Sequence, residues 1–135
     1  MTSADVQAWL DRYVQAWLTY DPGQIGDLFS QDGEYRYHPW DEPVRGRDAI
    51  VRSWTEPGAD ASARDKPGTY EAHYEPYAVA GNRAVATGWS RYFHPDGSFR
   101  TVYHNAYLLE FDDDGRCRSF TEFYIEQPKP KAGAG

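Results

Sequence analysis

Apolar residues recur every three or four positions over residues 4–19, which is the spacing of one buried helix face. The stripe consists of Val6, Trp9, Leu10, Tyr13, Val14, Trp17 and Leu18. Thr2 and Asp5 stand three residues apart at its start and match a capping box. The pattern predicts a long amphipathic first helix.

Shorter elements follow this helix. Asp21–Pro22 supplies an N-cap and a first-turn proline, so we expect a second helix that ends near Phe29–Ser30. The tyrosine-rich stretch 34–38 predicts a strand that ends at Pro39, because proline cannot donate to a ladder. Residues 48–55 predict a third helix.

The remainder of the chain predicts a meander of long strands bounded by turn residues. The expected strands are 69–80, 83–94, 98–111 and 116–126. Helices followed by an antiparallel sheet define an α+β fold, with three N-terminal helices packed on a curved, mainly antiparallel sheet. We expect one domain over 1–127, a mobile loop over 58–68 beside the cavity mouth, and a disordered tail over 128–135.

The composition favours some kinds of site and partner and argues against others. Aromatic residues make up 16 % of the 135 residues, including 11 Tyr and 5 Trp; these amphipathic rings favour a cavity or an interface, although they could also fill a small core. A net charge of −7 without a basic stripe argues against nucleic acid or an anionic membrane as partners. A single cysteine excludes an internal disulfide, and no long apolar segment occurs, so we expect a soluble cytoplasmic protein. Apolar residues on the outer sheet face favour a homodimer.

The layout resembles the nuclear transport factor 2-like superfamily, also called SnoaL-like, over roughly residues 5–127. The segments that carry the resemblance are Arg12–Val14, Asp21–Pro22, Leu28–Phe29 followed by Asp32, Gly46–Ile50 and Phe111–Arg116. The resemblance implies a cone-shaped α+β barrel. It does not specify an activity, because the fold hosts isomerases, dehydratases, cyclases, epoxide hydrolases and non-catalytic binding domains.

Within that superfamily, the front half looks most like ketosteroid isomerase. Tyr13 matches the oxyanion-hole tyrosine of that enzyme, Trp54 falls at a supporting tyrosine, and Tyr107 falls near its second oxyanion donor. His38 stands where the enzyme keeps its base aspartate, so the base carboxylate is absent. This departure argues against steroid isomerisation. A histidine base with a tyrosine pair looks closer to the scytalone dehydratase-like and polyketide cyclase-like branches.

The proton carriers that we expect are His38 and Glu122. A strand-end imidazole can act as an acid or a base near neutral pH, whereas the alternative is a structural or surface histidine. Strict alternation puts His38 on the face of Arg36 and Glu34, unless a bulge redirects it. We therefore leave open which face of this strand lines the pocket.

Glu122 shares one face of the last strand with Phe120 and Tyr124, and the resemblance puts that face inward. A carboxyl among rings would have a raised pKa and could share a proton with His38 or orient it. The alternative is an ion pair with Arg91 or Arg118.

The remaining site residues are expected to stabilise oxygen charge or to contact a ligand. Tyr13 and Tyr107 join His38 and Glu122 as catalytic candidates, and Asn105 alternates with Tyr107 on one strand face. The predicted ligand contacts are Trp17, Trp40, Trp54, Asn105, Phe120 and Tyr124. Strand 83–94 leaves open which of its two faces lines the pocket.

We expect neither a metal nor a cofactor. Glu71, His73 and Glu75 share one strand face, but consecutive strand residues rarely converge on one ion. Two functions stay open. The first is an isomerase, dehydratase or cyclase that transfers protons on a small apolar carbonyl compound in an aromatic-lined pocket. The second is a non-catalytic hydrophobic-ligand binding or accessory dimeric module.

Overall fold

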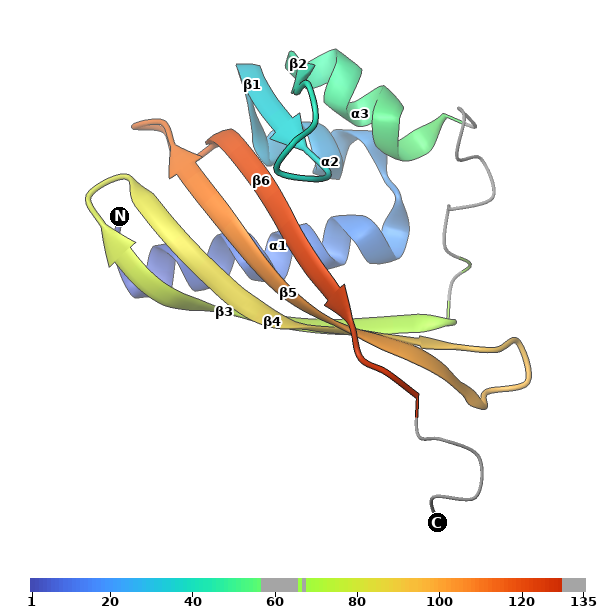
Figure 1. The fold of residues 1–135 in the computed structure, drawn as a ribbon. Helices are drawn as coiled ribbons and strands as arrows, with labels where there is room; N and C mark the ends of the chain where they lie inside the picture. The colour runs from blue at the N-terminus through green and yellow to red at the C-terminus, as the bar shows by residue number, and fades with distance from the viewer. Residues whose placement is uncertain (57–65, 67, 130–135) are drawn as a thin grey trace.

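The protein builds one mixed sheet and lays its helices against the concave side, as a computed structural model that describes residues 1–56, 66 and 68–129 shows (Figure 1). The elements are α1 (Ser3–Thr19), α2 (Pro22–Asp27), β1 (Phe29–Arg36), β2 (Val44–Arg45), α3 (Arg47–Thr55), β3 (Tyr70–Ala80), β4 (Arg83–Phe93), β5 (Phe99–Phe111) and β6 (Cys117–Glu126). The strand order is β2-β1-β6-β5-β4-β3, with β1 and β6 parallel and the other pairs antiparallel. The predicted α+β class and its four long strands are confirmed.

The long helix α1 begins and ends as its sequence predicts. Thr2 accepts a hydrogen bond from the Asp5 amide at 3.1 Å, and Asp5 accepts one from the Thr2 amide at 2.9 Å, which completes the capping box. Tyr20 then adopts a left-handed conformation with φ of 52° and ends the helix. The buried face of α1 consists of Val6, Trp9, Leu10, Tyr13 and Ala16, whereas Leu18 of the predicted stripe is 40 % exposed.

Two boundaries differ from the prediction. The second helix ends at Asp27, and Phe29 opens β1 instead of closing the helix, because it pairs in parallel with Cys117 of β6. The strand β1 ends at Arg36, so His38 lies in the following turn and not at a strand end. The turn frees His38 from the alternation of the strand.

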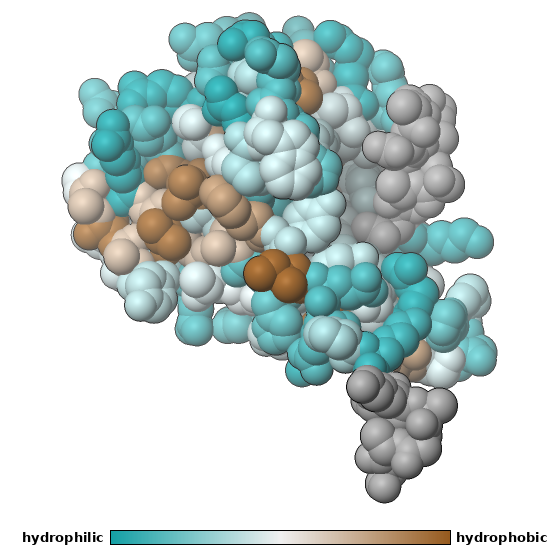
Figure 2. All heavy atoms as spheres, in the orientation of Figure 1, coloured by the Kyte–Doolittle hydropathy of each residue, from teal (hydrophilic) through white to brown (hydrophobic). Residues whose placement is uncertain are grey.

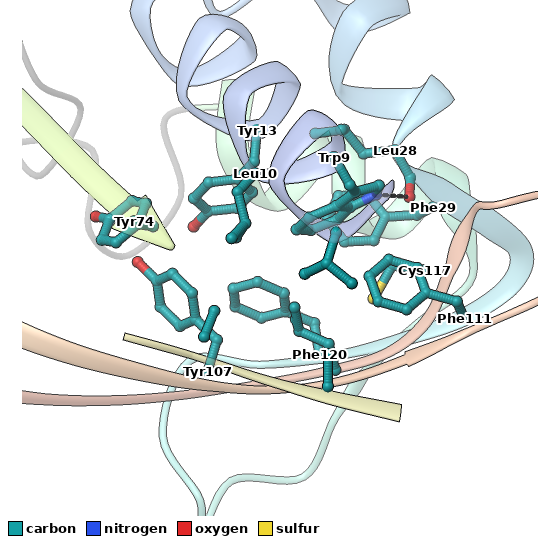
Figure 3. Packing of buried hydrophobic residues seen from close by; sticks show 14 of the residues in the cluster. Trp9, Leu10, Tyr13, Leu28, Phe29, Tyr74, Tyr107, Phe111, Cys117 and Phe120 are labelled. Atoms are coloured by element: carbon teal, nitrogen blue, oxygen red, sulfur yellow. Dashed lines mark hydrogen bonds between the residues drawn. The ribbon is translucent and has the colours of Figure 1, made fainter. Parts of the chain in front are cut away.

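A stack of aromatic rings fills the space between α1 and the sheet (Figure 3). Phe120 of β6 lies parallel to Tyr13 at 5.4 Å and to Tyr35 at 4.4 Å between ring centroids. Trp9 stacks on Tyr13, and its indole N–H donates to the Leu28 carbonyl at 3.0 Å. Burying each of these rings contributes roughly 1.5–3 kcal/mol, so the stack anchors α1 on the sheet.

Glycine allows β3 and β4 to approach each other closely where the sheet bends. A Cβ atom on Gly88 would lie 2.0 Å from the His73 carbonyl oxygen and 2.6 Å from the Tyr74 ring. The missing side chain leaves room for the Tyr74 ring beside Tyr107.

The outer face of the sheet carries an apolar patch (Figure 2). A shallow groove of about 360 Å³ runs over this face; among its lining residues are Ala78, Val85, Leu108 and Thr121.

Most of the predicted loop over 58–68, and the predicted tail after Lys129, lie outside the described residues. No helix in the described part of the chain is long and apolar enough to cross a membrane.

Candidate functional site

Glu122 lies on the inner face of β6, between Phe120 and Tyr124 along the strand. Its direct neighbour across the ladder is Tyr107 of β5. The partner of Phe120 on the other side is Tyr35 of β1. The register therefore brings a carboxyl group and tyrosines from two neighbouring strands to one inner surface, and α1 adds Tyr13 above it.

Hydrogen bonds connect these tyrosines in pairs. The Tyr13 and Tyr35 hydroxyls are 3.1 Å apart, and either can donate. Tyr107 hydrogen-bonds Tyr74, and the two rings lie next to each other in Figure 3. We call Tyr13, Tyr35, Tyr74 and Tyr107 the tyrosine cluster. All four are buried, which restricts them to a few fixed orientations.

Burial changes the acidity of the whole group. It raises the pKa of Glu122 from 4.5 to about 8, so this carboxyl is mostly neutral at pH 7. Burial, with a contribution from the Glu122 charge, holds the pKa values of Tyr13, Tyr35 and Tyr107 well above the usual range of a phenol. These phenols therefore keep their protons and remain hydrogen-bond donors.

Glu122 forms no hydrogen bond or ion pair with any described residue. Arg91 and Arg118, its alternative partners in the sequence, pair instead with Glu71 at 3.4 Å and Glu110 at 3.1 Å. The Glu122 residue is of intermediate burial, so its side chain is not sealed from solvent. A neutral, unpartnered carboxyl beside hydroxyl donors can exchange a proton with a bound molecule.

His38 lies at the entrance to this surface and joins two segments of the chain. Its Nδ1 atom is 2.8 Å from an Asp41 carboxylate oxygen, and its Nε2 atom is 2.7 Å from the Tyr124 hydroxyl. The ring stacks on Trp40 with centroids 5.0 Å apart. Trp40 is 79 % exposed, so it covers the imidazole from outside and does not line the interior.

The other predicted ligand contacts divide between the interior and its edges. Trp54 of α3 packs edge-on against Tyr13 at 5.4 Å, and its buried indole N–H has no partner among the described residues. Asn105 is buried and accepts a hydrogen bond from Ser90 at 3.2 Å. Trp17 stacks on Tyr70 at 4.4 Å, a neighbour different from those of Glu122 and His38.

The structure also answers which strand faces point inward. Gly88, Ser90 and Tyr92 of β4 lie on the inner face, because they pair with inner residues of β5, while Trp89 and Arg91 lie outside. Their burial agrees with this register, since Ser90 is 2 % exposed. The inner surface of the wide end is thus polar as well as aromatic.

Sequence reasoning missed Tyr35, Tyr37 and Asp41. The parity of β1 could have found Tyr35, had the strand been started at Phe29 and ended at Arg36. Asp41 follows His38 by three residues, a spacing at which a carboxylate can reach the imidazole inside one turn. The Tyr37 and Ser53 hydroxyls form a hydrogen bond of 2.8 Å, in which either can donate, and this bond joins the turn after β1 to α3.

A metal centre has no support in the described residues, where no group of three potential ligands converges. Glu71, His73 and Glu75 lie on the outer face of β3, and His73 and Glu75 only approach to 4.0 Å. Besides the outer groove, a second hollow lies between α2 and α3. Neither hollow is lined by Glu122, His38 or the tyrosine cluster.

The fold and this inner surface define a cone-shaped α+β protein of the nuclear transport factor 2-like type, with a carboxyl among tyrosines inside the cone. The SnoaL-like domain family matches residues 10–120, so the chain belongs to this family. No curated protein sequence matches the chain.

Two solved structures share the fold. One is an NTF-2-like protein of unknown function from Burkholderia xenovorans, with TM-score 0.65 and 15 % identity over 95 % of this chain and 88 % of the other. The second is an NTF2-like protein of unknown function from Mesorhizobium loti, with TM-score 0.61 and 22 % identity over 91 % of this chain and 93 % of the other. They confirm the predicted resemblance at the level of fold and bring no activity with them.

Proposed function

We propose that this protein is a small-molecule enzyme that transfers protons on a small, mostly apolar carbonyl compound, using its own side chains. The observation that carries the proposal is Glu122, a carboxyl with a pKa of about 8, no partner among the described residues and tyrosine donors around it. Strongly raised carboxyl pKa values at a ring-lined position are typical of groups that transfer protons.

The chemistry follows from the charge states. Below pH 8 Glu122 is mostly protonated and gives its proton to the substrate; above pH 8 it is ionised and takes one. Tyr13 and Tyr107 keep their protons and donate hydrogen bonds to the oxygen on which negative charge develops. The surrounding rings favour an apolar substrate that carries one carbonyl group, because a second charge would lack a partner there.

The enzyme acts, in this proposal, as a homodimer through the outer sheet face. The groove there is apolar and exposes Leu108 at 47 %. Beside it, Arg83 and Arg118 both bond Glu110, at 3.3 and 3.1 Å. A patch with apolar centre and charges of both signs is self-complementary under two-fold symmetry, which favours a second copy of this chain as the occupant.

The test is hydrogen–deuterium exchange at the carbon next to the carbonyl. Small cyclic ketones, enones and β-hydroxyketones are incubated in D₂O with the wild-type protein, and proton NMR follows exchange, isomerisation and loss of water. We expect catalysis of at least one probe and a loss of about 10²-fold or more in Glu122→Gln. Glu75→Gln, which changes an exposed carboxyl on the outer face, is the matched control and should keep full activity.

Two results would overturn the enzyme proposal. Equal rates for wild type and Glu122→Gln would remove the proton-carrying role from this residue. Saturable binding of the probes, seen as NMR shift changes of the tyrosine cluster, with no exchange in any of them would instead favour the non-catalytic binding module.

A further inference from the structure

Asp41, His38 and Tyr124 form a continuous hydrogen-bonded chain at the entrance of the cone. The two contacts, 2.8 Å from Asp41 to Nδ1 and 2.7 Å from Nε2 to the Tyr124 hydroxyl, join a turn to a strand 86 residues further along the sequence. All three side chains are one third to one half exposed, so the chain of bonds ends at a surface that solutes can reach.

The chemistry of the partners fixes the direction of these bonds. A carboxylate only accepts, so Nδ1 of His38 carries the hydrogen that points at Asp41. In the neutral imidazole Nε2 is then the acceptor, and the Tyr124 hydroxyl must donate to it. The phenol, the imidazole and the carboxylate are therefore arranged like a nucleophile or proton donor, its base, and the group that orients the base.

The position of Tyr124 connects this chain to Glu122. The two residues lie two positions apart on the inner face of β6, and the Glu122 charge influences the Tyr124 phenol. Other groups facing Tyr124 are Tyr103, which packs edge-on at 5.6 Å, and Asp41. The Tyr124 hydroxyl and the Glu122 carboxyl therefore belong to the same face of one strand.

We propose that Tyr124 is a second catalytic residue of this site, whose hydroxyl meets the substrate and relays its proton to His38, with His38 and Asp41 as positioning residues. The inference rests on the proposed function and deepens it, because it assigns the base that works opposite the Glu122 acid. As the phenolic oxygen takes a proton from the carbon beside the carbonyl, the phenolic proton moves to Nε2. The electron pair of the broken C–H bond passes to the carbonyl oxygen, and the return of both protons restores the site.

Acetylation by N-acetylimidazole tests the relay without any knowledge of the substrate. The phenolic oxygen forms an ester bond with the acetyl carbon, the phenolic proton passes to Nε2, and imidazole leaves after taking up a proton. Tyr77 is the internal control, because it is 77 % exposed, against 44 % for Tyr124, and makes no hydrogen bond to a histidine among the described residues. Peptide mass spectrometry measures both rates in the same sample at pH 7.5.

We expect Tyr124 to be acetylated about tenfold faster than Tyr77 in wild type, although exposure alone predicts the reverse order. His38→Gln should make Tyr124 slower than Tyr77. Asp41→Asn should reduce the advantage of Tyr124, and Asp41→Glu should restore part of it. The Tyr77 rate should be the same in every variant, and an unchanged urea midpoint reports that each variant is still folded.

A Tyr124 rate below that of Tyr77 in wild type, or a Tyr124 advantage that survives His38→Gln, would overturn the relay. The assay uses no ketone substrate, and Glu122 acts on it only through its charge, which raises the pKa of Tyr124. Glu122→Gln should therefore leave the Tyr124 advantage in place or increase it. The acetylation assay can therefore reject the relay while the exchange assay still supports Glu122 as the proton carrier. Equally, the exchange assay can reject Glu122 while the acetylation assay supports the relay.

Discussion

The raised pKa of Glu122 predicts that this residue makes folding less favourable as the pH rises. A carboxyl with a pKa of 4.5 in the unfolded chain and about 8 in the folded protein binds its proton more tightly when folded. Between these two values the folded protein holds a proton that the unfolded chain has released. The free energy of unfolding therefore falls through this window, and the loss is complete above pH 8.

The size of the effect follows from the difference between the two pKa values. At about 1.36 kcal/mol for each tenfold change in acidity, the shift from 4.5 to about 8 sets a ceiling of about 5 kcal/mol. Because Glu122 is partly exposed, solvent screening reduces this ceiling, and we expect about 2 kcal/mol. Glu122→Gln keeps the shape of the side chain and removes the charge. The variant should therefore match wild type near pH 5 and exceed it by about 2 kcal/mol at pH 9.

The assay is urea unfolding of wild type and Glu122→Gln at pH 5, 6, 7, 8 and 9, followed by tryptophan fluorescence. Subtracting the two curves at each pH cancels the contributions that all other groups make equally to both proteins. Tyr13, Tyr35 and Tyr107 do not interfere, because their raised pKa values lie above this window. A difference that stays constant from pH 5 to pH 9, or one that favours wild type as the pH rises, would refute the reasoning.

The sheet offers two further predictions. Gly88→Ala should destabilise the protein by about 3 kcal/mol, seen as a lower urea midpoint, because its Cβ would collide with the His73 carbonyl; Gly23→Ala, which meets only the Asp21 side chain at 3.2 Å, is the control and should change stability little. Leu108→Glu should convert a dimer into a monomer in light scattering, whereas Gln15→Glu on the exposed side of α1 should leave it unchanged. A wild-type protein that is monomeric at every concentration would exclude the proposed interface.

Local sequence patterns predicted the elements well where the pattern was long. The apolar stripe of α1 and the turn residues between the long strands located these elements within one or two residues of their observed ends. The pattern failed at Phe29, because its place in β1 depends on pairing with Cys117, which is distant in the sequence. Which tyrosines of this strand face the interior is therefore decided by its pairing with β6 and not by the local pattern.

The candidate site was predictable residue by residue but not as a set of contacts. Alternation put Glu122 on the face of Phe120 and Tyr124, and the family resemblance identified that face as the inner one. The position of His38 could not be assigned, because β1 ends two residues earlier and a turn replaces the alternation. The hydrogen bond between Tyr124 and His38 depends on the parallel pairing of β1 with β6, and no local sequence pattern encodes it.

The two carboxyls of the site lie in different surroundings. Glu122 is held among rings without a partner and stays mostly neutral at pH 7, whereas Asp41 lies in an open turn against the imidazole that it orients. Burial and the Glu122 charge both raise the pKa of Tyr124, so ionising Glu122 also holds the proton on the phenol. A negative charge on either group therefore disfavours one on the other, so Glu122 keeps its proton while the Tyr124 oxygen carries charge.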